Sequence, residues 1–439
     1  MLLRERAPAV ISPTAGASFW ALSRGPLRKS AKPARACGNR RLAIGTVFAH
    51  SGFGRKRRGI RRRFPRGAME VSPARRPESS SLVSIQALRA IAALLVFWGH
   101  AINAVTAQVA AEFPHLYGPF GVDIFFVISG FVMVYSSESL FGRPGAPSKF
   151  FARRIARIVP LYWAATAILV WFVVPYASTK AVLGSLFFAP HIPSEAPLLF
   201  VGWTLIFEMF FYAVFAIALL AKRRFAVVAG ASVFLVAFSV VFGPAPSTDN
   251  LWGPPAASSV AYLADPVIME FIFGMMIALV YRAGVRLPIW ATISLLIAAF
   301  IWFAATVPWV PRPYGAGIAA ALILAAVSLS SISSPKGNPF TRTVVFLGDI
   351  SYALYCTHLL SFSFVAWIVA KLAISPVGHA WAYFAAMLAT GLVIAAGTYL
   401  LFEKPTTNFL KRVIERPRLP ATSAIAVPEI VGRGARSRL

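Results

Sequence analysis

Acidic residues are scarce in this chain, and cysteine is almost absent. Asp and Glu number 15 in 439 residues, and the four charged residue types together make up only 13% of the sequence. The two cysteines, Cys37 and Cys356, lie far apart, which excludes a disulfide framework and a paired-cysteine metal site. With 58% hydrophobic residues and a mean hydropathy of +0.70, the composition differs from that of soluble globular proteins and indicates a polytopic membrane protein.

Several enzyme signatures are missing as well. We find no nucleophile elbow of a Ser-His-Asp hydrolase, no Walker loop and no His-Glu-x-x-His zinc signature. We therefore expect a site without a metal ion. Long apolar runs recur from about residue 82 to 402, which leaves no room for a large soluble domain.

The N-terminal segment is strongly basic. Residues 1–80 hold 19 of the 43 Lys and Arg residues, and they are rich in Gly and Pro, which predicts a disordered head. Met69 begins a short polar lead to the first helix and is an alternative start; a transit peptide is a second alternative. The head lacks a folded or aromatic platform, so we expect no nucleic-acid binding. Residues 81–405 are the predicted membrane domain, and 406–439 a basic cytoplasmic tail.

The apolar runs predict an all-α bundle of about ten transmembrane helices. Their approximate ranges are 82–105, 119–138, 158–175, 200–221, 225–243, 258–281, 288–308, 315–333, 346–370 and 379–402. Residues 181–193 are apolar but too short to span, which favours an interfacial or re-entrant segment.

The distribution of cations predicts the orientation. If the basic N-terminus is cytoplasmic, every connection that returns to the cytoplasm is basic. The opposite connections hold only Lys180, Arg312 and Lys371 as cations. The positive-inside rule therefore predicts that both termini are cytoplasmic.

Two polar residues interrupt the first predicted helix. Arg89 and His100 are eleven residues apart, so they lie on one helix face, about 16 Å apart along the axis. Arg89 can snorkel to the interface and His100 can make a structural interhelical hydrogen bond. The functional alternative makes His100 a general base or a nucleophile, since ionisable residues inside a membrane are costly.

Further polar residues lie in or beside other predicted spans. Asp123 and Glu208 are candidates to orient the imidazole of His100, and Ser129-Gly130 permits close helix packing. Arg154 and Arg157 form one cationic helix face that suits phosphate groups, or alternatively anchors the protein to anionic lipid. We predict a structural role for His358, which lies six residues after Tyr352 and therefore on roughly the opposite helix side.

Six segments, taken together and in order, resemble the membrane acyltransferase-3 family, and closest is the branch that acylates exopolysaccharides. They are the Arg89-x10-His100 pair, Gly121 to Phe131, the Arg154-x-x-Arg157 pair, Trp203 to Tyr212, Gly348 to His358, and Glu403 to Pro405. The match runs from about residue 82 to 405.

The resemblance implies a ten-helix enzyme of the bacterial inner membrane that moves an acyl group, usually acetyl, from cytoplasmic acyl-CoA to a sugar hydroxyl. The acceptor is a lipid-linked or polymeric glycan. His100 is implied as the catalytic histidine with Arg89 as its partner, and Arg154 and Arg157 as donor-side cations. His100 either deprotonates the hydroxyl or first accepts the acyl group itself. A proton-coupled transporter of an anionic metabolite is the alternative class, because such carriers also place ionisable residues within spans.

Overall fold

The computed structural model describes residues 79–109, 117–190, 197–246, 258–307, 309–332, 338–375 and 377–415. The predicted head, except its last two residues, the alternative start Met69 and the tail beyond residue 415 lie outside the described residues.

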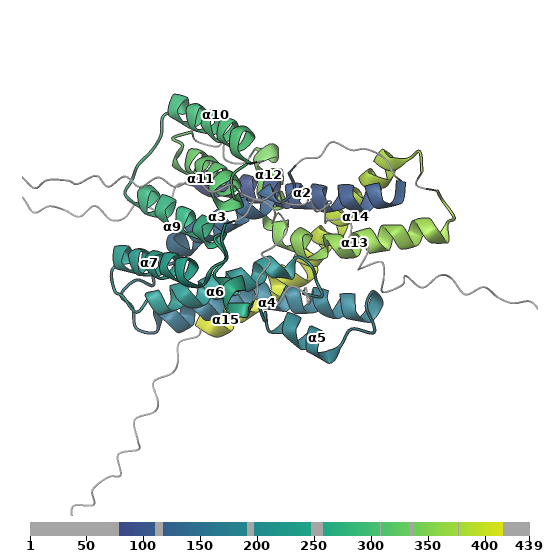
Figure 1. The fold of residues 1–439 in the computed structure, drawn as a ribbon, viewed down its shortest axis with the longest axis horizontal. Helices are drawn as coiled ribbons and strands as arrows, with labels where there is room; N and C mark the ends of the chain where they lie inside the picture. Colours follow the sequence, from purple (N-terminus) through teal and green to yellow (C-terminus); the bar gives the residue numbers. More distant parts are fainter. Residues whose placement is uncertain are drawn as a thin grey trace, which may run out of the picture. The chain divides into compact units, whose positions relative to one another are not determined.

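Helices make up most of the described structure, and no strand lies in it, which confirms the all-α prediction (Figure 1). The long helices are α2 (Ser79–Val109), α4 (Ala146–Phe172), α7 (Arg224–Phe242), α10 (Ile289–Thr306), α11 (Arg312–Leu329), α13 (Ser351–Lys371) and α14 (Ala380–Thr398). The shorter ones are α3 (Phe120–Ser136), α5 (Thr179–Leu186), α6 (Gly202–Ala218), α8 (Ser259–Leu263), α9 (Ile268–Arg282), α12 (Pro339–Asp349), the π-helix η1 (Tyr399–Glu403) and α15 (Lys404–Glu415).

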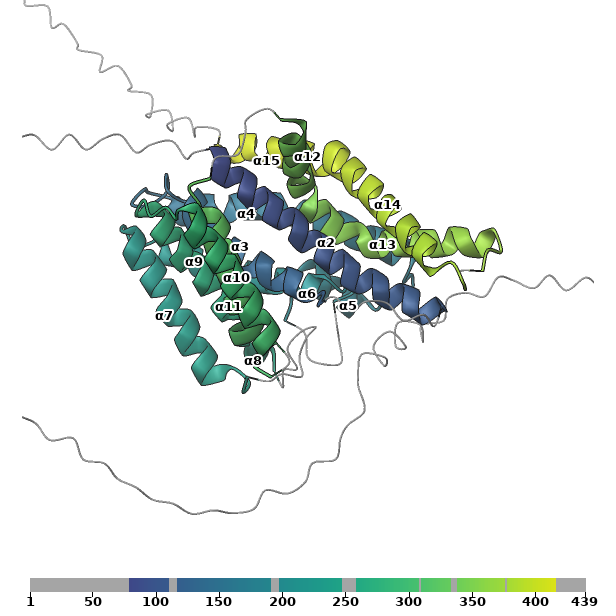
Figure 2. The same cartoon turned by 90° about the horizontal axis from the view of Figure 1, so that it is seen from above.

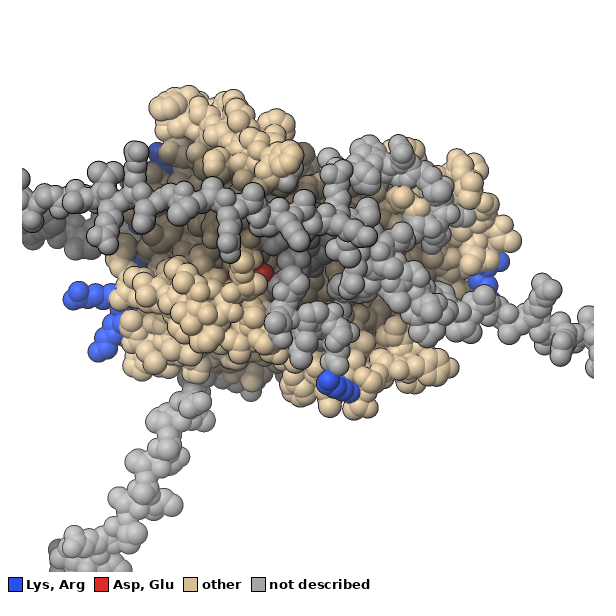
Figure 3. Space-filling view, in the orientation of Figure 1, with Lys and Arg blue, Asp and Glu red and all other residues tan. Residues whose placement is uncertain are grey.

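Eight helical stretches of the described chain are long and apolar enough to cross a membrane. Two more of the ten expected spans, α3 and α6, are apolar helices of 17 residues each. On the face shown in Figure 3 the described residues are mostly uncharged, with Lys and Arg near the edges. Large apolar side chains such as Trp171, Phe172 and Phe300 are more than 70% exposed, as expected of surfaces that contact lipid.

Two predicted helix boundaries are wrong. The helix expected to begin at residue 158 begins at Ala146, with Pro147 in its first turn, because the basic run that follows is itself helical. The span predicted at 258–281 agrees with the apolar helical stretch Ser259–Arg282. This stretch is interrupted between α8 and α9, where Asp265 Oδ1 accepts a hydrogen bond from the Val267 amide at 2.8 Å beside Pro266. The span predicted at 346–370 is broken at Ile350 into α12 and α13.

The segment predicted as interfacial at 181–193 contributes the short helix α5. The last predicted helix does not end at 402 but passes through η1 into α15, which lies along α4. The first residues of the predicted tail are therefore helical.

Close helix packing in the core depends on glycines, as Ser129-Gly130 suggested. α3 has its most extensive contact with α9. A methyl group at Gly130 would overlap the backbone oxygen of Phe271, and one at Gly274 would overlap that of Val127. The two helices therefore meet backbone to backbone, a form of packing that small residues allow in membranes.

Helix α2 has a central position among the helices that build the site. It contacts α3 and α11 as well as α12, α13 and α14 (Figures 1 and 2). Gly348 at the end of α12 packs directly on the backbone of Gln86. Segments that are more than 200 residues apart in the sequence thus meet on α2.

Candidate functional site

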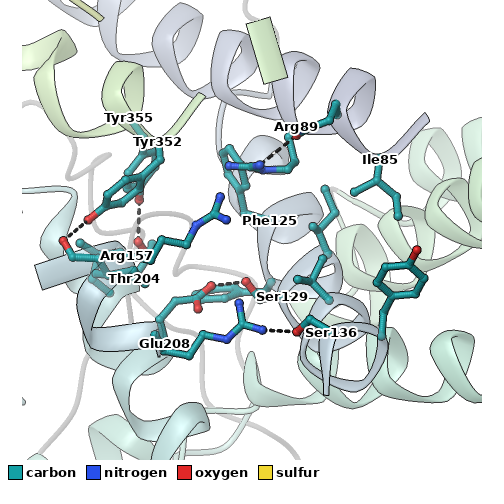
Figure 4. A pocket seen from close by; sticks show the side chains of 18 of the residues that line it. Ile85, Arg89, Phe125, Ser129, Ser136, Arg157, Thr204, Glu208, Tyr352 and Tyr355 are labelled. Atoms are coloured by element: carbon teal, nitrogen blue, oxygen red, sulfur yellow. Dashed lines mark hydrogen bonds between the residues drawn. The ribbon is translucent and has the colours of Figure 1, made fainter. Parts of the chain in front are cut away.

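A cavity of about 600 Å³ lies between α2, α3, α4, α6, α12 and α13. Three of its lining residues are the predicted cations Arg89, Arg154 and Arg157 (Figure 4). The side chains of Arg89 and Arg157 point toward one another across the cavity. Since like charges so placed repel, the arrangement suits a ligand with several negative charges.

Arg89 is held in place by a chain of hydrogen bonds. Its Nη1 donates to Gln86 Oε1 at 2.9 Å, and Gln86 Nε2 donates to Asp349 Oδ1 at 2.5 Å. Gln86 lies one turn before Arg89 on α2, whereas Asp349 is the last residue of α12. The chain therefore orients the guanidinium from two helices, which limits snorkelling of Arg89 along the helix surface.

Arg154 is fixed by a hydrogen bond and by aromatic rings. Its Nη2 donates to Ser136 Oγ at the end of α3 (Figure 4). The guanidinium carbon lies 5.2 Å from the ring centroid of Phe150 and 5.6 Å from that of Tyr212, within the range of cation–π attraction. The structure thus brings the Arg-x-x-Arg pair and Arg89 to one space, although their three roles remain predictions.

Glu208 also lines this cavity. Ser129 donates a hydrogen bond to Glu208 Oε1 across α3 and α6, and the residue is only 8% exposed. Tyr212 lies one turn further along α6 on the same helix face and lines the same cavity. Glu208 is therefore part of the wall of the cationic cavity.

Asp123, the second residue predicted to orient His100, forms a buried ion pair with Arg312. Arg312 at the start of α11 donates from Nε to Asp123 Oδ1 at 2.7 Å, and neither side chain is more than 7% exposed. The guanidinium of Arg312 also lies 5.5 Å from the ring of Trp203. Burial, together with the Asp123 carboxylate, raises the pKa of Tyr117, which precedes α3. These contacts join α3 to α11, and the predicted role of Asp123 at His100 stays a prediction.

His100 lies three helical turns beyond Arg89 and is 4% exposed. The cavity lining includes Arg89 but not His100. The imidazole centroid of His100 is 5.2 Å from that of His358 on α13 and 5.5 Å from the ring of Phe200. The pair of histidines was missed in the sequence, because helix periodicity relates residues within one helix and not across two.

Between the cavity and the histidine pair lies Tyr355. This residue lines the cavity, its hydroxyl lies 2.6 Å from Thr204 Oγ1, and its ring centroid is 6.3 Å from that of His358. In the sequence, Tyr355 stood out only as part of the segment from Gly348 to His358. No pattern in the sequence pointed to Gln86, Ser129 or Ser136 as site residues. Among the described residues no group of three His, Cys, Asp or Glu side chains is placed to hold a metal ion.

Comparisons with known proteins agree with one another. A family model described as an acyltransferase domain, acyltransferase type 3, matches residues 82–400. The chain is 35% identical over 305 residues to the exopolysaccharide production protein ExoZ of Rhizobium meliloti (strain 1021). This match covers 66% of this chain and 89% of that protein. It is 26% identical over 374 residues to the acyltransferase MdmB of Streptomyces mycarofaciens, and this match covers 76% of this chain and 94% of that protein. No solved structure matches it.

Proposed function

The chain belongs to the acyltransferase-3 family of membrane acyltransferases, as its motifs predicted, and from this premise we propose that it acylates an exopolysaccharide or another surface glycan. The donor is cytoplasmic acyl-CoA, with acetyl as the group transferred, and the acceptor is a sugar hydroxyl of a lipid-linked or polymeric glycan. The name of the related ExoZ protein supports a role in exopolysaccharide production.

The single observation that carries the proposal is the cavity lined by Arg89, Arg154 and Arg157. Coenzyme A carries several phosphate charges, and arginine binds phosphate through pairs of hydrogen bonds. The remaining lining is largely apolar and aromatic, for example Phe125 and Val132, which suits the uncharged arm that leads to the thioester. The cavity is thus able to take both ends of an acyl-CoA molecule.

His100 is the reacting group in this proposal. It lies on the same helix as Arg89 and further into the bundle, where an acyl chain that passes Tyr355 would arrive. An imidazole nitrogen can deprotonate the sugar hydroxyl or attack the thioester itself. In either case Arg89, Arg154 and Arg157 bind the donor, Glu208 contributes to the wall of the donor cavity, and Asp123 holds α3 to α11.

We also propose that both termini are cytoplasmic and that the membrane is the inner membrane of a bacterium. The connection between α3 and α4 precedes the Arg-x-x-Arg pair, and α4 begins at Ala146, just before the basic run. This orientation opens the cationic cavity toward the compartment that contains acyl-CoA.

The experiment is transfer of labelled acetyl from acetyl-CoA to glycan in membranes that contain the protein. Wild type is expected to label the glycan, and His100→Ala and Arg89→Ala are each expected to abolish labelling while the protein remains inserted. Wild-type labelling in His100→Ala would overturn the assignment of His100. If neither acetyl-CoA nor longer acyl donors label any glycan with folded wild type, the proposed donor is wrong.

A further inference from the structure

His358 lies beside His100, and the proposed function so far gives it no role. The two rings belong to α13 and α2, with centroids 5.2 Å apart and planes inclined by 48°. Both residues are buried, at 1% and 4% exposure. Two imidazoles with centroids this close can act on the same small group, because a group bound to one ring lies within a few ångströms of the other.

The backbone of α13 fixes which nitrogen of His358 carries the proton. Nδ1 lies 3.1 Å from the carbonyl oxygen of Leu354 and 2.9 Å from that of Tyr355. A carbonyl oxygen only accepts hydrogen bonds, so Nδ1 must be the N–H donor. In the neutral ring Nε2 then carries the lone pair and is the basic atom.

The basic atom of His358, Nε2, accepts no hydrogen bond in the described structure. Nε2 is buried and has no hydrogen-bond partner among the described residues. The rings of Phe97 and Phe362, with centroids 6.2 and 5.5 Å away, flank the imidazole. Since buried polar atoms are normally paired, this fixed acceptor beside His100 is suited to accept a proton from a bound ligand.

The location of His358 relates it to the donor cavity. Tyr355, one turn before His358, lines the cavity, and its own carbonyl accepts the Nδ1 proton. The same residue therefore belongs to the cavity wall and orients the imidazole. A group that reaches the cavity end at Tyr355 lies next to the histidine pair.

We propose that His358 is the general base that activates the acceptor hydroxyl, while His100 carries the acyl group. This inference rests on the proposed function. In the first step a nitrogen of His100 bonds to the thioester carbonyl carbon, the C–S bond breaks, and CoA leaves as the thiolate, which solvent protonates. In the second step the sugar oxygen bonds to the acyl carbon, the C–N bond breaks with its electron pair returning to His100, and the hydroxyl proton passes to His358 Nε2. His358 then releases this proton to solvent, which restores both rings.

The test separates these two steps in the full-length protein. His358→Asn keeps an amide N–H close to the position of Nδ1 and removes the basic Nε2. Thr357→Val is the matched control, because its hydroxyl is buried one residue away and donates only within α13, to Ala353 O at 2.8 Å. Labelled acetyl-CoA is mixed with each variant in glycan-bearing membranes, and CoA release, acetylated protein and acetylated glycan are measured over time.

We expect His358→Asn to release about one equivalent of CoA and to accumulate acetylated protein, while glycan labelling falls at least about 100-fold. His358→Gln places an amide near the position of Nε2 and is expected to behave like His358→Asn. Thr357→Val is expected to behave like wild type. Glycan labelling at the wild-type rate in His358→Asn would overturn the proposal. The proposal would also be overturned if both His358 variants failed to release CoA while Thr357→Val still released it. His358 would then be needed for folding or for the first step. If wild type itself labels no glycan, the proposed function fails instead.

Discussion

At the scale of single residues, two neighbours determine the position of Arg89: the uncharged Gln86 and the negatively charged Asp349. Gln86 accepts from Arg89 and donates to Asp349, so the guanidinium is oriented before any ligand arrives. Such preorganisation lowers the entropy lost when a ligand is bound. Asp349 contributes to the cationic cavity through Gln86, although it does not line it.

Gln86→Leu should therefore weaken donor binding without changing the chemical step. Loss of one hydrogen bond to a charged group corresponds to about 1.5 kcal/mol or more, which is an increase of about tenfold in the apparent KM for acetyl-CoA. Because the contact is the same in ground and transition states, kcat should be unchanged. Initial-rate kinetics check this, with Asp349→Asn as a control that retains the acceptor oxygen. A fall in kcat at constant KM would contradict the assignment.

The buried pair of Asp123 and Arg312 leads to a prediction about stability. Removing one partner leaves an uncompensated buried charge, so Asp123→Asn should lower the free energy of unfolding by about 3–5 kcal/mol. The double variant Asp123→Leu/Arg312→Met should lose less, since neither charge then remains. Thermal unfolding in detergent measures both. An unchanged melting temperature in Asp123→Asn, together with lost acylation, would instead show Asp123 to be a reacting group.

At the scale of helices, the crossing of α3 and α9 determines where Ser129 and Asp123 lie. Gly130 and Gly274 let the two backbones touch, and α3 then presents Ser129 to Glu208 on one side and Asp123 to Arg312 on another. The site is thus sensitive to the separation of two helices and not only to its own side chains.

Gly130→Ala should destabilise the protein, because the added methyl group overlaps the Phe271 backbone, which cannot move aside as a side chain does. Overpacking of this kind costs about 1–3 kcal/mol. Gly230→Ala on α7 is the matched control: no atom lies within 4 Å of the added carbon, so the helix should gain up to about 1 kcal/mol. Thermal unfolding of both variants is the measurement, and equal effects would refute the close crossing.

Helices and faces could be predicted from the sequence, but contacts between helices could not. Hydropathy located the apolar runs, and periodicity placed Glu208 and Tyr212 on one face, because both signals are local. Asp123 and Arg312 are 189 residues apart, and nothing in their sequence neighbourhoods relates them. His358 was assigned a structural role for the same reason, since the contact with His100 exists only after α13 packs on α2.

At the scale of the whole molecule, function depends on the two sides of the membrane being different. In the proposed reaction the donor comes from the cytoplasm and the glycan is exposed outside, so the cationic cavity has to open toward the cytoplasm. The basic connections predict this orientation. Lys222 lies in a predicted inner connection and Tyr176 in an outer one, and both are exposed.

Cysteine labelling in intact cells tests the orientation. In a Cys37→Ser background, Tyr176→Cys should react with a membrane-impermeant maleimide in intact cells. Lys222→Cys should react only after permeabilisation, because its connection faces the cytoplasm. Native Cys356 is buried and should remain unlabelled in both. The reverse pattern would place the cavity on the wrong side for cytoplasmic acyl-CoA.

The most direct test of the central claim, that the cationic cavity binds acyl-CoA, is equilibrium binding of acetyl-CoA to the purified protein. Arg154→Gln/Arg157→Gln should raise the Kd at least about tenfold, because it removes two charged contacts to phosphate. Lys222→Gln/Arg223→Gln removes the same charge from exposed positions outside the cavity and should leave the Kd within about twofold of wild type. Equal affinity in the Arg154→Gln/Arg157→Gln protein and wild type would contradict the claim and leave these arginines as lipid anchors.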